Sequence, residues 1–272
     1  MKKYNEMNVA LYTDSGAAER YEEKALIKSG IKYMKIGPDD VAAGTLEDYD
    51  VFIIPGAFPL KAHGKGGFRE FFRFFDRVGG KLLPHILKFV ENGGGLIAVC
   101  ASVGIFGKSI KFPYIPVSLG IKPVSTFSYR GVFGKKVGII NVEKSKNLPP
   151  HREKIARRIL GTYYDEEFFT SLYFRGPIMT YKEETDDEFI VAVYSDTEPK
   201  NMAGKGAIAY RKYGKGKMLM CSIHPEFNAF DIFDYFIEFT GNPDSAYENE
   251  EYENKKVGIQ QKPKHNEQIE VK

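Results

Sequence analysis

The chain has 272 residues, of which 43% are hydrophobic and 28% charged, and its formal net charge is +3. These values fit a globular protein built as one large domain or two small ones. Basic and acidic residues are interleaved, so we expect no nucleic-acid partner. No run approaches the roughly 18 consecutive apolar residues that a membrane span needs, so we expect no membrane association.

The apolar run at residues 9–12 follows a basic start, but it is too short for a signal peptide. We therefore expect a cytoplasmic protein. In that setting the two cysteines, Cys100 and Cys221, should be free thiols rather than a disulfide. The five histidines are scattered, and four ligands at zinc-finger spacing are absent, so we expect no bound metal and no other cofactor.

The first half of the chain alternates short apolar runs with helical patterns. A helix is predicted from residue 17 to about 29, and a longer helical stretch over 68–92 is interrupted by Gly79-Gly80 and Pro84. Short strands alternating with helices are typical of a mostly parallel sheet covered by helices on both faces. The predicted strands are VALY (9–12), YMKI (33–36), DVFII (50–54) and LIAV (96–99).

The second half is rich in β-strand patterns separated by turn residues, which predicts an antiparallel addition to the sheet. A final amphipathic helix over 226–241 should pack the side chains of Phe227, Phe230, Phe233, Phe236 and Ile237 against the sheet. From residue 243 onward the chain is polar and charged, which predicts a disordered tail over 243–272 after a single domain spanning 1–242. The predicted strands of this half lie within 135–143, 173–181, 188–195, 206–214 and 216–223.

One cysteine stands where a buried strand should meet a helix, in GGGLIAVCASVGIFG (93–107). A nucleophile at such a turn needs small neighbours two positions away on each side, and Ala98 and Ser102 meet that need. The amide dipoles of the following helix would favour the reactive thiolate of Cys100. A buried structural cysteine explains this stretch equally well on its own.

A second motif, HPE, ends the strand pattern GKMLMCSI. His224 could accept the thiol proton as a general base, and Glu226 could orient its ring. Cys221, three residues before His224, should face the other side of the strand and belong to the core. A thiol at a strand-to-helix turn together with a His-Pro-Glu at a strand end favours a catalytic function.

These segments resemble a known family. VALYTDSGAA, DVFIIPGA, FVENGGGLIAVCAS, YFRGP and YGKGKMLMCSIHPEF follow, in order, the pattern of class I glutamine amidotransferases over roughly residues 7–240. More narrowly, the chain resembles the amidotransferase-like domain at the N-terminus of biotin-protein ligases and its stand-alone relatives. The resemblance implies an α/β fold with a mostly parallel central sheet flanked by helices. It also implies Cys100 as nucleophile, His224 as base and Glu226 as the orienting carboxylate.

The resemblance further implies an oxyanion hole built from backbone N–H groups. Ala101 would supply one of these groups, and Gly56 or Ala57 the other. The sequence departs from the family at the nucleophile turn, where Ala98 and Ser102 replace two glycines, and at Ala57, where the subgroup carries glycine.

Three further residues are candidates for the binding site. Ser15 and Ser102 could line it, because ligands bind at the carboxyl ends of parallel strands. Arg175 could meet a substrate carboxylate, although a solvated arginine is equally consistent with its position.

The resemblance leaves three functions open. The first is a glutaminase-type hydrolase or transferase that acts on a small-molecule amide or related carbonyl through a covalent thioester. Because no ammonia-accepting module is recognisable in the sequence, such an enzyme would need a partner synthetase or ligase subunit. The second is a regulatory module that binds a ligand or partner with little or no turnover, which the substituted glycines favour and the Cys-His-Glu set opposes. The third is a thiol peptidase or deglycase-like activity.

Overall fold

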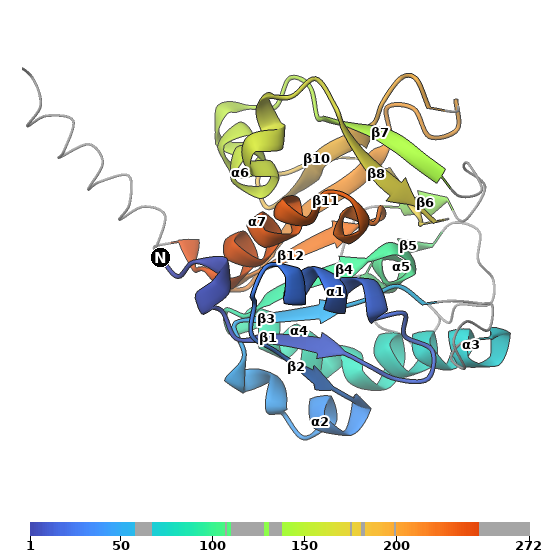
Figure 1. Ribbon diagram of the computed structural model, residues 1–272, viewed down its shortest axis with the longest axis vertical. Helices are drawn as coiled ribbons and strands as arrows, with labels where there is room; N and C mark the ends of the chain where they lie inside the picture. Colours follow the sequence, from blue (N-terminus) through green and yellow to red (C-terminus); the bar gives the residue numbers. More distant parts are fainter. Residues whose placement is uncertain are drawn as a thin grey trace, which may run out of the picture.

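The fold was analysed in a computed structural model (Figure 1). The structure describes residues 1–57, 67–106, 108–109, 128–130, 138–174, 176–180, 183–198 and 200–244.

Five parallel strands form the centre of the sheet. Their spatial order is β2-β1-β3-β4-β12, and every neighbouring pair in this series runs parallel. The strands are β1 (Val9–Tyr12), β2 (Tyr33–Ile36), β3 (Val51–Ile54), β4 (Gly95–Val99) and β12 (Gly216–Cys221). The last of these strands in sequence thus lies beside β4, whereas all the others come from the first 100 residues. The parallel α/β arrangement predicted from the sequence is confirmed.

The sheet continues beyond β12 as antiparallel strands in the order β11-β10-β7-β8, with β9 pairing to β11 and a short branch through β6 and β5. These strands are β5 (Lys108–Ser109), β6 (Ser128–Arg130), β7 (Gly138–Lys144), β8 (Phe169–Tyr173), β9 (Ile178–Thr180), β10 (Glu188–Tyr194) and β11 (Gly206–Tyr213). The predicted antiparallel addition is therefore part of the same sheet.

Helices and turns connect the strands. The α-helices are α1 (Arg20–Lys28), α2 (Pro38–Ala42), α3 (Phe68–Asp76), α4 (Leu83–Glu91), α5 (Val103–Phe106), α6 (Pro150–Leu160) and α7 (Phe230–Gly241). The tighter turns are η1 (Tyr4–Glu6), η2 (Thr45–Asp48), η4 (Cys100–Ser102), η5 (Gly161–Asp165) and η6 (Pro225–Phe227), and η3 (Arg77–Leu82) is a π-helical segment.

The central strands are buried on both faces, and alternate residues of each strand enter different clusters. In β1, Val9 and Leu11 belong to the hydrophobic cluster that includes residues of α1, α6 and α7, whereas Ala10 and Tyr12 belong to the cluster that includes residues of α2, α3 and α4. Figure 1 shows α1 and α7 together on one face of the sheet. Cys100, which directly follows β4, belongs to the same cluster as residues of α1 and α7.

Two helical predictions differ from the structure. The break predicted at Gly79-Gly80 is the π-helical segment η3, which joins α3 to α4 without leaving helical geometry. The final helix begins at Phe230 rather than at residue 226, because Pro225–Phe227 forms the separate turn η6. Phe233, Phe236 and Ile237 are buried as predicted, but Phe227 lies outside the helix and is 41% exposed.

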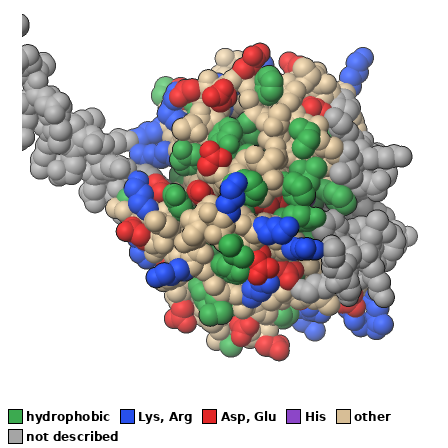
Figure 2. Space-filling model, viewed as in Figure 1, with side chains coloured by type: hydrophobic (Ala, Val, Ile, Leu, Met, Phe, Trp, Pro, Cys, Tyr) green, Lys and Arg blue, Asp and Glu red, His purple; other side chains and the backbone are tan. Residues whose placement is uncertain are grey.

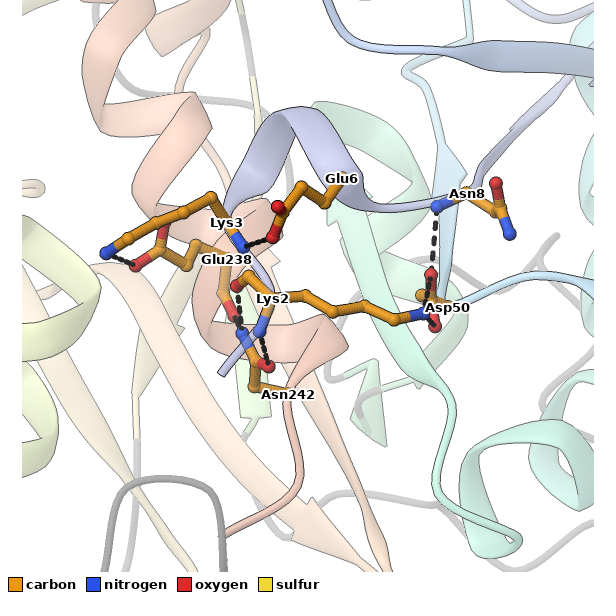
Figure 3. Close-up of polar contacts among 7 residues, drawn as sticks. All are labelled: Lys2, Lys3, Glu6, Asn8, Asp50, Glu238 and Asn242. Carbon is orange, nitrogen blue, oxygen red and sulfur yellow. Dashed lines mark hydrogen bonds and ion pairs between the residues drawn. The ribbon is translucent and has the colours of Figure 1, made fainter. Parts of the chain in front are cut away.

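Polar contacts fasten the first residues to the end of α7 and to the start of β3 (Figure 3). The backbone N–H of Lys2 donates to Oδ1 of Asn242 at 2.9 Å, and Nδ2 of Asn242 donates to the carbonyl of Lys2 at 2.8 Å. Nζ of Lys2 pairs with Asp50 at 2.7 Å, and Lys3 pairs with Glu238 at 3.5 Å. Asp50 directly precedes β3, so these contacts lie at the amino ends of the central strands, opposite to the carboxyl end of β4.

On the face drawn in Figure 2, acidic and basic side chains are interspersed rather than segregated. None of the helices within the described residues has the length and apolar character needed to span a bilayer. The predicted tail lies outside the described residues beyond Asp244.

Candidate active site

Cys100 stands at the carboxyl end of β4 in a strained backbone conformation. Its φ is 54°, and among the described residues Asn147 is the other non-glycine residue with a positive φ. Asparagine tolerates this region, whereas a residue such as cysteine occupies it at a cost of about 1–3 kcal/mol. The strain arises because a fully buried strand turns directly into η4. This geometry projects the thiol from a sharp strand-to-helix turn, as the sequence predicts.

The turn is held by Ser102. Its side chain is fully buried, and its Oγ lies 2.7 Å from the carbonyl oxygen of Val99 and 3.0 Å from that of Ile54. One hydroxyl proton serves both carbonyls, which come from β4 and β3. Ser102 therefore ties the nucleophile turn to the ends of two strands.

Gly56 lies against both the thiol and the imidazole. A Cβ atom added there would be 3.1 Å from Cβ of Cys100, 3.6 Å from its Sγ and 3.7 Å from Cε1 of His224. The glycine thus leaves room for Cys100 and His224 to lie side by side at the end of β3. Ala57 forms an isolated bridge with Ala17, so the segment after β3 is paired to the segment before α1.

His224 and Glu226 form a short hydrogen bond. Nδ1 of His224 is 2.5 Å from Oε1 of Glu226, and the two residues are 5% and 1% exposed. The backbone N–H of His224 donates to the carbonyl of Leu172 at 2.8 Å, which anchors the turn to β8. Because Nδ1 is engaged, Nε2 is the nitrogen left to exchange a proton, and it has no hydrogen-bond partner among the described residues.

The electrostatic surroundings of His224 favour its protonated form. Burial by itself lowers the pKa of the imidazole, but Cys100 and Glu226 beside it outweigh burial and raise that pKa well above its usual range. The Cys100 side chain is almost fully buried, and its Sγ lies 3.5 Å from the carbonyl oxygen of Phe174. An imidazole near a thiol, with a carboxylate holding its other nitrogen, can accept the thiol proton.

The site contains a second carboxyl group that the sequence reasoning missed. Glu22 is 1% exposed and lies on the inner face of α1 with Ala25 and Leu26. Burial and the neighbouring Glu226 raise the pKa of Glu22 well above its usual range, against smaller opposing effects of His224 and nearby backbone amides. A sequence signal existed, because a charged residue three and four positions before two buried apolar residues lies on the helix face turned to the core.

Glu22, His224 and Glu226 each offer an atom within 4.8 Å of the others, and all three are buried. Among the described residues this is the group of side chains best placed to approach a cation. The short bond between Nδ1 and Oε1 already occupies one atom of His224 and one of Glu226. The arrangement is therefore that of a hydrogen-bonded pair with a carboxyl group beside it.

The other predicted residues differ in their relation to this group. Ala101 follows Cys100 in η4 and is half-buried. Ser15 is exposed and donates a hydrogen bond to Glu70 of α3, and its place in the binding site stays a prediction. Arg175 lies outside the described residues. Cys221 is fully buried in the same cluster as Cys100, and burial raises the pKa of its thiol well above the usual range.

Comparison with solved structures defines the class of fold. The structure of PurLQS from Thermotoga maritima matches with a TM-score of 0.56 and 15% identity, covering 88% of this chain and 97% of that one. A protein described as a GMP synthase subunit from Thermoplasma acidophilum matches with a TM-score of 0.54 and 15% identity, covering 90% and 98%. The chain therefore has the class I glutamine amidotransferase-like fold, as its resemblance in sequence implies.

Comparison of sequences adds one relative. The biotin-protein ligase of Schizosaccharomyces pombe is 26% identical over an alignment of 161 residues, which covers 53% of this chain and 22% of that protein. The chain thus matches about a fifth of the length of this relative. No known family profile matches the chain.

Proposed function

We propose that Cys100 attacks the carbonyl carbon of a small-molecule amide, of which a glutamine-type side chain is the leading candidate. The observation that carries this proposal is a cysteine with positive φ beside a buried histidine whose Nδ1 is 2.5 Å from a carboxylate oxygen. Strained residues and buried acid–base pairs cluster at functional sites.

The reaction would proceed in two balanced steps. Nε2 of His224 takes the thiol proton, a bond forms between Sγ of Cys100 and the carbonyl carbon, and the same proton then passes to the departing amine as the C–N bond breaks. Water attacks the resulting thioester, His224 takes a proton from the water, and Cys100 leaves as the thiol. Glu226 accepts the Nδ1–H throughout and stabilises the imidazolium.

Charge that develops on the carbonyl oxygen needs donors close to the thiol. We propose that the backbone N–H of Ala101 and that of Gly56 or Ala57 supply them. The position of Gly56 beside Sγ of Cys100 supports this assignment.

The ammonia released would pass to a separate synthetase or ligase protein. The relative in fold that is itself described as part of a GMP synthase supports this part of the proposal. We place the active unit in residues 1–242 and the reaction in the cytoplasm, where free thiols stay reduced. Both cysteines are free in the structure.

A specific observation favours a second candidate, a regulatory binding module. Ser102 fills the nucleophile turn with a buried side chain where the amidotransferase pattern has glycine, and part of the chain is similar to a biotin-protein ligase. Such a module would bind a small ligand or a partner ligase and turn over little.

The deciding experiment is the rate of Cys100 alkylation by iodoacetamide as a function of pH. Wild type and His224→Ala are compared in a Cys221→Ser background, so that one thiol is followed. The proposal expects alkylation that is already fast below neutral pH and slows when His224 is removed. Ammonia release from glutamine then distinguishes turnover from binding. Alkylation that is independent of His224 contradicts the catalytic proposal and leaves the binding module.

A further inference from the structure

We propose that Glu22 is a positioning residue whose protonated carboxyl group donates a hydrogen bond to Oε2 of Glu226 and so holds that carboxylate against His224. This inference rests on the proposed function, because it assigns Glu226 the role of orienting the base. It adds a fourth residue to Cys100, His224 and Glu226. This residue lies on α1, outside the two sequence motifs that contain the other three.

The geometry shows which atoms lack partners. Among the described residues, both oxygens of Glu22, Oε2 of Glu226 and Nε2 of His224 are buried and make no hydrogen bond of ordinary geometry, although the backbone N–H groups of Glu22 and Gly56 lie near enough to Glu22 to lower its pKa against the effect of burial. Buried polar groups are normally hydrogen-bonded, so a cluster of such atoms needs an explanation. Atoms of the three residues lie within 4.8 Å of one another, which brings the two carboxyl groups together.

Two ionised carboxylates in a dry site repel each other, and a protonated His224 supplies only one positive charge for the two of them. Within the described residues, no lysine or arginine forms an ion pair with Glu22. The titratable groups that face Glu22 are Glu226 and His224 from the segment after β12, with Cys221 at the end of β12 nearby. On its own helix Glu23 pairs with Lys35 instead.

A proton on Glu22 neutralises its carboxyl group and so removes the repulsion between the two carboxylates. The neutral carboxyl group becomes an O–H donor, and Oε2 of Glu226 becomes its acceptor. Glu226 then accepts from Nδ1 of His224 through one oxygen and from Glu22 through the other. The raised pKa of Glu22, caused mainly by burial, agrees with this protonation state. No covalent bond other than O–H is involved, and the proton stays with the two carboxyl groups.

The test compares Glu22→Gln with Glu22→Ala in the Cys221→Ser background. Glutamine keeps a hydrogen-bond donor but cannot ionise, so Cys100 alkylation should stay within about twofold of the Cys221→Ser parent. Alanine leaves Oε2 of Glu226 without a donor and should slow alkylation about tenfold. Glu47→Gln removes an exposed carboxylate and is the matched control.

Stability against pH gives a readout that does not use the thiol. A carboxyl group whose folded pKa is raised binds its proton more tightly in the folded state than in the unfolded one. Wild type should therefore lose stability relative to Glu22→Gln as the pH rises above about 4.3, the ordinary pKa of glutamate. Thermal unfolding midpoints of both proteins between about pH 5 and about pH 9 measure this difference.

The outcomes separate the two proposals. If the difference in unfolding midpoint between wild type and Glu22→Gln stays constant across this range, Glu22 is not protonated in the folded protein. If Cys100 is alkylated equally fast in Glu22→Gln and Glu22→Ala, Glu22 does not position Glu226. Zn²⁺ binding to wild type, measured by calorimetry and lost in Glu22→Gln, would also overturn the inference, because the group would then hold a cation. If His224→Ala leaves alkylation unchanged while the midpoint difference still grows with pH, the proposed function fails and the protonated Glu22 stands.

Discussion

The ring of Tyr21 packs on that of Phe227, with 4.6 Å between the ring centroids and 45° between the planes. Each residue is the direct sequence neighbour of a buried carboxyl group, since Tyr21 precedes Glu22 and Phe227 follows Glu226. The contact joins α1 to η6 next to the place where the two carboxyl groups meet. A partly exposed aromatic pair thus sets the distance between two elements of the candidate site.

Phe227→Ala should loosen this junction. Loss of an aromatic pair costs about 1 kcal/mol beyond the lost burial, so urea unfolding should show a moderate destabilisation. Alkylation of Cys100 should slow as well, because Phe227 and Glu226 share η6 and His224 directly precedes it. Phe168→Ala is the control, since Phe168 is comparably exposed. Equal effects of the two substitutions on alkylation would contradict the positioning role of this contact.

Gly56→Ala should impair the thiol without unfolding the protein. The new Cβ would lie 3.1 Å from Cβ of Cys100, closer than side chains normally pack, so the turn at Cys100 must shift. We expect alkylation to slow by about tenfold, since small displacements of reacting groups have large effects on rate. Gly37→Ala, where the nearest atoms are 3.7 and 3.8 Å away, is the matched control. Unchanged alkylation in Gly56→Ala would show that this glycine does not constrain the site.

Ser102→Ala should destabilise the fold. The substitution leaves the carbonyls of Ile54 and Val99 without the hydroxyl that now bonds them, which costs about 1–3 kcal/mol for buried groups. Ser15→Ala removes a hydroxyl from the surface and should cost less than about 0.5 kcal/mol. The free energy of unfolding from urea titration measures both. A larger loss at Ser15 than at Ser102 would contradict the assignment of Ser102 as the residue that holds the turn.

Lys217, at the start of β12, should make the folding stability depend on pH with the opposite sign to that expected for Glu22. Its Nζ donates to the carbonyls of Phe239 and Asn242, and burial lowers its pKa to about 8, although Asp244 opposes that change. The unfolded chain therefore binds the proton more tightly between pH 8 and 10.5. Wild type should gain stability relative to Lys217→Met as the pH rises through this window. If the difference in unfolding midpoint between wild type and Lys217→Met does not change with pH, the pKa of Lys217 is not lowered in the folded protein.

Much of the fold could be predicted because short buried strands and amphipathic helices have clear periods. The four parallel strands of the first half fall where the apolar runs predict them, and the last strand precedes His-Pro-Glu. The sequence predicts a helix break at Gly79-Gly80, because glycine disfavours helices in general. In the structure a π-helical turn between α3 and α4 accommodates both glycines. Phe227 lies outside the helix because Asn228 and Ala229 leave helical geometry between η6 and α7, although the apolar spacing continues across them.

The site was only partly predictable. Cys100, His224 and Glu226 each carry a recognisable local signal, and parallel-strand geometry brings such strand ends to one edge. Helical spacing places Glu22 on the buried face of α1, but its proposed role depends on a contact between α1 and η6 that no local pattern encodes. The hydrogen bond of Ser15 to Glu70 joins residues 55 positions apart, and no local pattern predicts it.

The place of β12 in the sheet has a consequence for the newly made chain. The strand that leads to His224 is inserted between β4 and β11, although it is the last strand to be synthesised. Pairing between segments so distant in sequence is slow, because the long loop between them must close, at a cost in entropy, before the stabilising contacts form. A nascent chain can therefore complete β1, β3 and β4 and expose Cys100 as an ordinary thiol. Reactivity would be withheld until β12 has been synthesised and has paired with β4 and β11.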